Sequence, residues 1–187
     1  RPGAVAGRPG GRPAVLRRLP AGRGEGPWGW AAALGTLRAG EGPFRGAALS
    51  SVVPALTGPV ADALACVTGG RVLTVGRDTP TGLPLGDYDG ATLGMDRVVD
   101  CVAALARYAP PLAVFDMGTA TTLSVVDREG VFRGGMILAG LSLSLDALRA
   151  RAAQLPPVTL SPPDGLVGTV TERCIRYGAL YAHAVAV

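Results

Sequence analysis

Residues 115–122 (FDMGTATT) decide how this sequence folds. They overlap the end of a short apolar run, residues 112–115, which predicts a buried strand. Gly118 permits a sharp turn there and a close approach of the main chain to a ligand. The amide groups of the turn and the Thr119 hydroxyl can then face a phosphate, while Asp116 is placed to hold a cation.

The residues that follow predict two further strands. Residues 123–127 are largely apolar, residues 128–130 (REG) make a turn, and residues 131–138 return as another strand. The order of strand, phosphate turn, strand, hairpin and strand is typical of a ribonuclease-H-like nucleotide-binding domain. Such a domain indicates a kinase-like protein.

Composition excludes several classes of function. All 18 basic residues are arginine, and the absence of lysine excludes a Walker A loop and Schiff-base chemistry. The only histidine, His183, argues against Ser-His catalysis. There is no apolar run of membrane-spanning length and no signal-peptide pattern, so we expect a cytoplasmic protein without a membrane partner. The net charge of +4 comes with an arginine-rich first segment lacking aromatic residues, so we expect no nucleic-acid partner either.

Helical and strand-like segments alternate along the chain, which predicts an α/β protein. We expect two domains, residues 1–93 and 94–187. In the first, Thr57 is the predicted N-cap of a helix that runs through Cys66. The second begins with a helix over residues 95–108, and a further helix is predicted from residue 141 to about 154. The predicted elements of the first domain are a strand at 14–18, a helix at 28–37, strands at 46–53 and 71–75, and a loop at 79–92.

Six short motifs occur in an order that resembles the type III pantothenate kinases, over roughly residues 46–187. They are residues 50–54 (SSVVP), 94–97 (GMDR), 116–122 (DMGTATT), 134–141 (GGMILAGL), 154–156 (QLP) and 168–171 (GTVT). Each motif alone is weak evidence for the family, but six motifs in this order are fairly specific for it.

The resemblance implies an actin-like ATPase fold with two similar ribonuclease-H-like domains and ATP in the cleft between them. It implies a transferase that phosphorylates pantothenate to 4'-phosphopantothenate, the first step of coenzyme A biosynthesis. It also implies Mg²⁺, a monovalent cation (K⁺ or NH₄⁺) and a homodimer. The alternatives are a non-catalytic regulatory or accessory protein of the same fold, or another actin-like small-molecule kinase or phosphatase.

By position in the motifs, Asp96 matches the family's catalytic base, which takes the proton of the hydroxyl that is phosphorylated. The alternative is that Asp96 only caps its helix. Arg97 would bind the carboxylate of pantothenate, because its planar fork suits a carboxylate. The alternative for Arg97 is a surface ion pair with Asp100.

The remaining site residues also follow from the resemblance. Asp116 matches the ligand of the monovalent cation, and Thr119 with Gly118 matches the contact with an ATP phosphate. The expected substrate contacts, besides Asp96 and Arg97, are Tyr88, Gly94, Met95 and Thr171. Tyr88 lies one residue closer to Gly94 than is usual in the family.

The sequence also departs from the family pattern. An Asp-x-Gly-Asn-Thr phosphate loop near the N-terminus and a C-terminal strand and helix are missing, so we expect a chain truncated at both ends. Within the chain, Ala139 replaces a proline, Ala152 a threonine and Val170 an asparagine. If each lost hydrogen bond costs about 1 kcal/mol, the affinity falls several-fold at each such site without excluding the chemistry.

Overall fold

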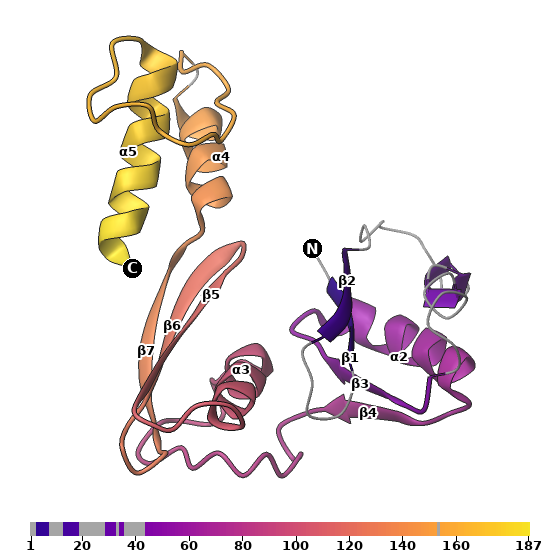
Figure 1. Ribbon diagram of the computed structural model, residues 1–187. Helices are drawn as coiled ribbons and strands as arrows, with labels where there is room; N and C mark the ends of the chain where they lie inside the picture. The colour runs from indigo at the N-terminus through magenta and orange to yellow at the C-terminus, as the bar shows by residue number, and fades with distance from the viewer. Residues whose placement is uncertain (1–2, 8–12, 19–28, 33, 36–43, 153) are drawn as a thin grey trace. The chain divides into compact units, whose positions relative to one another are not determined.

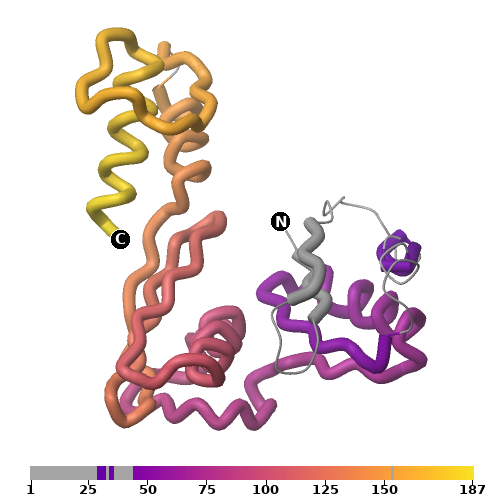
Figure 2. The backbone as a smooth tube through the Cα atoms, in the orientation of Figure 1, coloured from indigo at the N-terminus to yellow at the C-terminus, as the bar shows by residue number. Residues whose placement is uncertain are grey.

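A computed structural model describes residues 3–7, 13–18, 29–32, 34–35, 44–152 and 154–187. The chain divides into two compact units, Arg1–Thr79 and Pro80–Val187, which are described separately (Figures 1 and 2). Strands and helices occur in both units, and the predicted mixed α/β class is confirmed.

The first unit contains two pairs of strands. Strand β1 (Gly3–Gly7) pairs antiparallel with β2 (Pro13–Arg18). Strand β3 (Ala47–Ser50) pairs parallel with β4 (Val72–Val75), and helix α2 (Pro54–Thr68) connects them. Parallel strands need such a crossover, because the chain must return to the starting end of the sheet before the second strand begins. A small apolar cluster of this unit contains buried Trp30, Leu34 and Ala63.

The start of α2 differs from the prediction. The helix begins at Pro54, after Val53 as N-cap, because proline at the first helical position needs no amide partner. Thr57 lies inside the helix, where its hydroxyl is within hydrogen-bond distance of the Val53 carbonyl (3.1 Å) and of Ser51 Oγ (2.9 Å). The prediction that Thr57 is the N-cap is therefore wrong. The helix ends at Gly69, whose φ of 67° is the left-handed conformation that glycine adopts readily.

The second unit is built on an antiparallel meander. Strand β5 (Leu112–Met117) pairs with β6 (Ala120–Val126), which pairs with β7 (Phe132–Ala139). The strand, turn, strand, hairpin and strand expected around residues 112–138 are therefore confirmed. Helix α3 (Met95–Leu105) precedes the sheet, and helices α4 (Leu141–Arg151) and α5 (Thr171–Ala186) follow it (Figure 1).

The core of this unit lies between α3 and one face of the sheet. Cys101 of α3, Val126 of β6 and Phe132 of β7 are fully buried there, together with Leu83 and Leu93 of the loop before α3. The amide of Phe132 also donates to the carbonyl of Pro84 (2.8 Å). Because this loop packs with the sheet, it belongs to the second compact unit, which begins at Pro80. The domain boundary at residue 93 stays a prediction.

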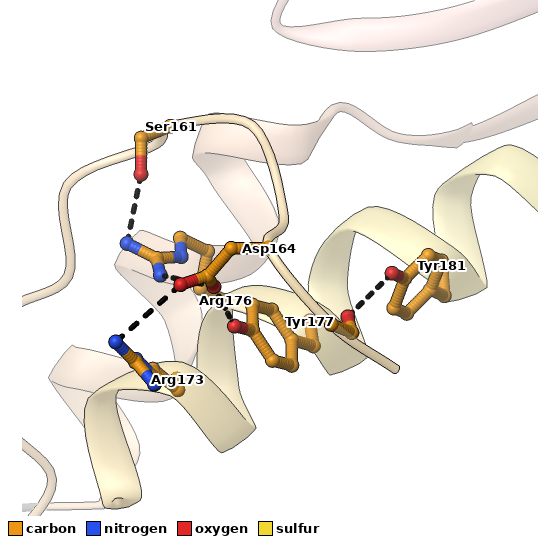
Figure 3. Close-up of polar contacts among 7 residues, drawn as sticks. Ser161, Asp164, Arg173, Arg176, Tyr177 and Tyr181 are labelled. Carbon is orange, nitrogen blue, oxygen red and sulfur yellow. Dashed lines mark hydrogen bonds and ion pairs between the residues drawn. The ribbon is translucent and has the colours of Figure 1, made fainter. Parts of the chain in front are cut away.

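Polar contacts hold the segment before α5 against that helix (Figure 3). The Tyr177 hydroxyl donates to Asp164, and the Tyr181 hydroxyl donates to the carbonyl of Gly165 (2.6 Å). Arg173 and Arg176 lie 3.4 and 3.7 Å from the Asp164 carboxylate. The hydrogen bond from Tyr177, with smaller contributions from both guanidinium groups, lowers the pKa of Asp164.

No helix within the described ranges is long and apolar enough to cross a bilayer.

Candidate functional site

Gly118 and Thr119 connect β5 to β6 and form the turn that the sequence predicts (the phosphate turn below). The Gly118 amide donates to the carbonyl of Ala120 at 2.9 Å, which closes the turn tightly. Both turn residues are exposed, so the Thr119 hydroxyl is accessible to a ligand. Asp116 lies two residues earlier on β5, opposite Thr122, and is also exposed.

Gly140, the N-cap of α4, packs directly against the phosphate turn. Its amide donates to the carbonyl of Thr119 at 2.9 Å. A Cβ atom at Gly140 would lie 2.1 Å from the Gly118 oxygen and 2.5 Å from the Thr119 oxygen, so only glycine fits. The N-terminus of α4, where the helix dipole is positive, therefore adjoins the turn. Sequence analysis placed Gly140 in a motif but did not predict this contact.

Asp96 lies in the first turn of α3, after Gly94 as N-cap. Its Oδ1 accepts a hydrogen bond from the Arg97 amide (2.9 Å). A Cβ atom at Gly94 would approach this same Oδ1 to 2.4 Å, so the carboxylate lies over Gly94. Asp96 is thus not the N-cap residue itself, although it satisfies one free amide of the first turn.

Asp100 adds a carboxylate that the sequence analysis did not assign to the site. Burial raises the pKa of Asp100 above its usual value, and the negative charges of Asp116 and Asp96 raise it further. Helix α3 packs against β5, so the charges of Asp96 on α3 and Asp116 on β5 act on Asp100. The signal in the sequence was the spacing of Asp96 and Asp100, which places them on one helix face.

Arg97 is buried between α3 and the sheet, with 6% of its surface exposed. Its Nε donates to Ser124 Oγ (3.0 Å) and its Nη2 to the Leu123 carbonyl (2.9 Å). The guanidinium carbon lies 5.2 Å from the centre of the Phe132 ring, within the range of a cation–π contact. The alternative of a surface ion pair with Asp100 is therefore wrong, and binding of a substrate carboxylate stays a prediction.

The other predicted substrate contacts are only partly brought together. Tyr88 meets Phe132 edge to face at 5.0 Å, so it lies beside the same ring as Arg97. Met95 packs half-buried against the core next to Asp96. Thr171 begins α5 with an exposed side chain, and in the described part of the chain no hydrogen bond joins it to α3 or the phosphate turn.

The only histidine contacts the strand that follows the phosphate turn. Thr121 Oγ1 and His183 Nε2 of α5 are 3.0 Å apart, and Thr121 is almost fully buried. This hydrogen bond ties the last helix to β6, a contact that sequence analysis did not predict because the partners are far apart in the chain.

The side chains near the phosphate turn limit which cations could bind there. Among the described residues, no group of three or more His, Cys, Asp or Glu side chains could hold a metal ion. Mg²⁺ commonly binds through one or two carboxylates together with substrate phosphates, and the exposed Asp116 beside the phosphate turn fits that arrangement. A monovalent cation next to Asp116 would likewise depend on the ligand for further oxygen atoms.

Comparison with known proteins identifies the family of the chain. The family profile described as type III pantothenate kinase matches residues 29–187. Three similar proteins of that name come from Rhodospirillum centenum (44% identical, 73% of this chain and 53% of that protein), Rubrobacter xylanophilus (41%, 74% and 53%) and Moorella thermoacetica (38%, 74% and 54%). The chain spans about half the length of these curated relatives. On the strength of the profile match, the chain belongs to the type III pantothenate kinase family.

Proposed function

We propose that the protein phosphorylates pantothenate with ATP, which gives 4'-phosphopantothenate and begins coenzyme A biosynthesis. The observation that carries this proposal is the family match over residues 29–187. The geometry supports it, because one unit holds both a carboxylate at a helix N-terminus and an exposed Gly-Thr turn.

Asp96 is the proposed catalytic base. Phosphoryl transfer depends mainly on positioning and charge stabilisation, so a carboxylate within hydrogen-bond reach of the acceptor hydroxyl suffices to take its proton. The Arg97 amide fixes Oδ1, which orients the carboxylate. Gly94, Met95, Tyr88 and Thr171 are proposed as further substrate contacts.

Gly118 and Thr119 are proposed to contact a phosphate of ATP, with Asp116 holding the monovalent cation. The exposed Thr119 hydroxyl offers a hydrogen-bond donor, and the N-terminus of α4 beside the turn supplies positive polarity for an anion. The bound cations would neutralise phosphate charge. The actin-like fold with two similar ribonuclease-H-like domains, ATP in the cleft between them, the homodimer and a cytoplasmic location also belong to the proposal.

The test is a phosphorylation assay on the protein expressed from its complete reading frame, with ATP, Mg²⁺, pantothenate and either K⁺ or Na⁺. We expect turnover that depends on K⁺. Asp96→Asn should lower kcat by roughly 100-fold or more, the usual contribution of a general base. The matched control is Asp62→Asn, an exposed aspartate of α2, which should retain full activity.

Two results would overturn the proposal. One is a folded wild-type protein that forms no phosphopantothenate. If such a protein still binds ATP, a non-catalytic member of the fold would be favoured. The other is turnover that is unchanged in Asp96→Asn.

A further inference from the structure

The ring of Phe132 on β7 contacts two residues that the family resemblance implies as substrate contacts, Tyr88 and Arg97. The Tyr88 ring meets it edge to face, with 5.0 Å between the ring centres. The guanidinium carbon of Arg97 lies 5.2 Å from the centre of the same ring. Tyr88 comes from the loop before α3 and Arg97 from α3 itself, so one buried ring joins two separate segments.

We infer that Phe132 is a positioning residue, which holds Tyr88 and Arg97 in the arrangement that binds pantothenate and does not touch the substrate itself. This inference rests on the proposed function, with Tyr88 and Arg97 as substrate contacts of the same site. Phe132 is fully buried, so it can act on a ligand only through its neighbours.

The main chain of Phe132 also holds the loop that carries Tyr88. The Phe132 amide donates to the carbonyl of Pro84 at 2.8 Å, and the Tyr88 amide donates to the carbonyl of Leu85 at 3.0 Å. The loop is therefore fixed to β7 just before Tyr88, and the Phe132 ring then contacts the Tyr88 side chain.

Two glycines of β7 lie against the same two side chains, which is an argument independent of the ring contacts. A Cβ atom at Gly134 would lie 3.4 Å from two carbons of the Tyr88 ring, so this ring lies directly against the main chain. A Cβ atom at Gly135 would lie 2.9 Å from Arg97 Nη2, so a side chain there would displace the guanidinium. Strand β7 thus presents one aromatic ring and bare backbone to both proposed contacts.

Both contacts of the Phe132 ring are of a kind that orients the partner. An edge-to-face pair depends on the angle between the two rings, which is 83° here. A cation–π contact depends on the place of the cation over the ring face, and it is stronger when the cation is desolvated. An aliphatic side chain in the same place would be buried as well, but it would orient neither partner. The proposed role therefore depends on the ring and can be separated from burial alone.

The test replaces Phe132 with leucine, which keeps an apolar side chain in the core but has no ring. Calorimetric titration with pantothenate and steady-state kinetics are carried out on the protein expressed from its complete reading frame. In Phe132→Leu, Kd and KM for pantothenate should rise by roughly 10-fold, which corresponds to about 1.4 kcal/mol. KM for ATP should stay close to that of the wild type, because the phosphate turn does not contact this ring.

Val126→Ala is the matched control, because Val126 is fully buried in the same core cluster and pairs with Phe132 across β6 and β7. Within the described ranges, no hydrogen bond or ring contact joins Val126 to Tyr88 or Arg97. The control should lower Tm but leave KM for pantothenate near the wild-type value. All measurements are made well below each variant's Tm and per folded molecule, so a loss of stability alone would not change KM.

A double-mutant cycle shows whether Phe132 acts through its neighbour. In a Tyr88→Ala background, Phe132→Leu should weaken pantothenate binding clearly less than it does in the wild type, because one of the two side chains that it orients is already absent. An equal loss of affinity in both backgrounds would overturn the inference.

Proton NMR gives a readout that needs neither turnover nor a ligand. The Phe132 ring current should shift the ring signals of Tyr88, which the Tyr88→Phe variant identifies. This shift should disappear in Phe132→Leu and remain in Val126→Ala. The inference is also overturned by unchanged Tyr88 signals in Phe132→Leu, by unchanged pantothenate affinity, or by an equal rise of KM in the control. A wild-type protein that does not bind pantothenate would instead refute the proposed function, and the NMR signals would still decide whether the ring orients Tyr88.

Discussion

Gly140→Ala should displace the phosphate turn without changing any group that could contact ATP. The backbone at Gly140 has a φ of −65°, which any residue adopts, so the substitution acts through the added methyl group alone. This methyl carbon would lie 2.1 Å from the Gly118 oxygen, whereas real Cβ atoms essentially never approach closer than 3.0 Å. The difference, 3.0 minus 2.1, means that the turn or α4 must move by about 0.9 Å.

The loss of unfolding free energy can be estimated from the known effects of overpacking. Inserting a methyl group into a closely packed site costs about 1–3 kcal/mol of unfolding free energy. At about 2–4 °C per kcal/mol for a chain of this size, Tm should fall by roughly 2–12 °C. A shift of the turn by nearly 1 Å should lower kcat/KM for ATP, by up to about 100-fold. KM for pantothenate should change much less, because Gly140 packs against the phosphate turn.

Urea denaturation and steady-state kinetics with varied ATP measure both effects. Gly178→Ala is the matched control: Gly178 lies inside α5, where a Cβ atom would meet nothing within 4 Å. Alanine should stabilise that helix by about 0.5–1 kcal/mol and leave the kinetics unchanged. If Gly140→Ala keeps wild-type stability and wild-type ATP kinetics, the reasoning about the turn is refuted.

Three further predictions concern the second unit. Phe132→Ala should destabilise the protein by about 3–5 kcal/mol in urea denaturation, because the ring is fully buried, and a loss below 1 kcal/mol would contradict its place in the core. Burial and the nearby acidic charges raise the pKa of Asp100, so the folded state binds this proton more tightly than the unfolded state, and stability should fall as the pH rises from 3.8 through the higher folded value. Asp100→Asn removes that loss and should be more stable than the wild type at pH 7, and this advantage should disappear below pH 3.8. Equal stability of the two proteins at pH 7 would show that ionising Asp100 does not cost folding stability. Thr121→Val should cost about 1 kcal/mol through its lost hydrogen bond with His183, and His183→Ala in the Thr121→Val background should then cost much less than it does alone.

The strands around the phosphate turn could be predicted from the sequence because their signals are local. Apolar runs, the glycine of the turn and residues 128–130 mark β5, β6 and β7 without reference to the rest of the chain. The start of α2 was predicted four residues too late, because Thr57 is a common type of N-cap residue, whereas the observed N-cap is Val53, before Pro54. Strand β1 (Gly3–Gly7) was missed as well, since a glycine-rich segment carries no apolar alternation.

The contacts that define the site were not predictable, because they depend on pairing between distant segments. Ser124 and Leu123 accept hydrogen bonds from Arg97 only because α3 packs on this face of the sheet in one register. Periodicity in α3 shows which residues are apolar, but it does not show which strand they meet. For the same reason, an arginine that looked accessible in the sequence is buried in the structure.

The contacts of Asp164 with α5 imply that one part of the second unit can open by itself. Most residues between 154 and 170 are exposed, and the Asp164 side chain is 58% exposed, so water and salt reach the contacts that hold this segment. Protonation of Asp164 would remove its attraction for Arg173 and Arg176. Within the second unit, we therefore expect proteases to cut this segment first, at low pH and high salt, while the β5–β7 meander stays intact.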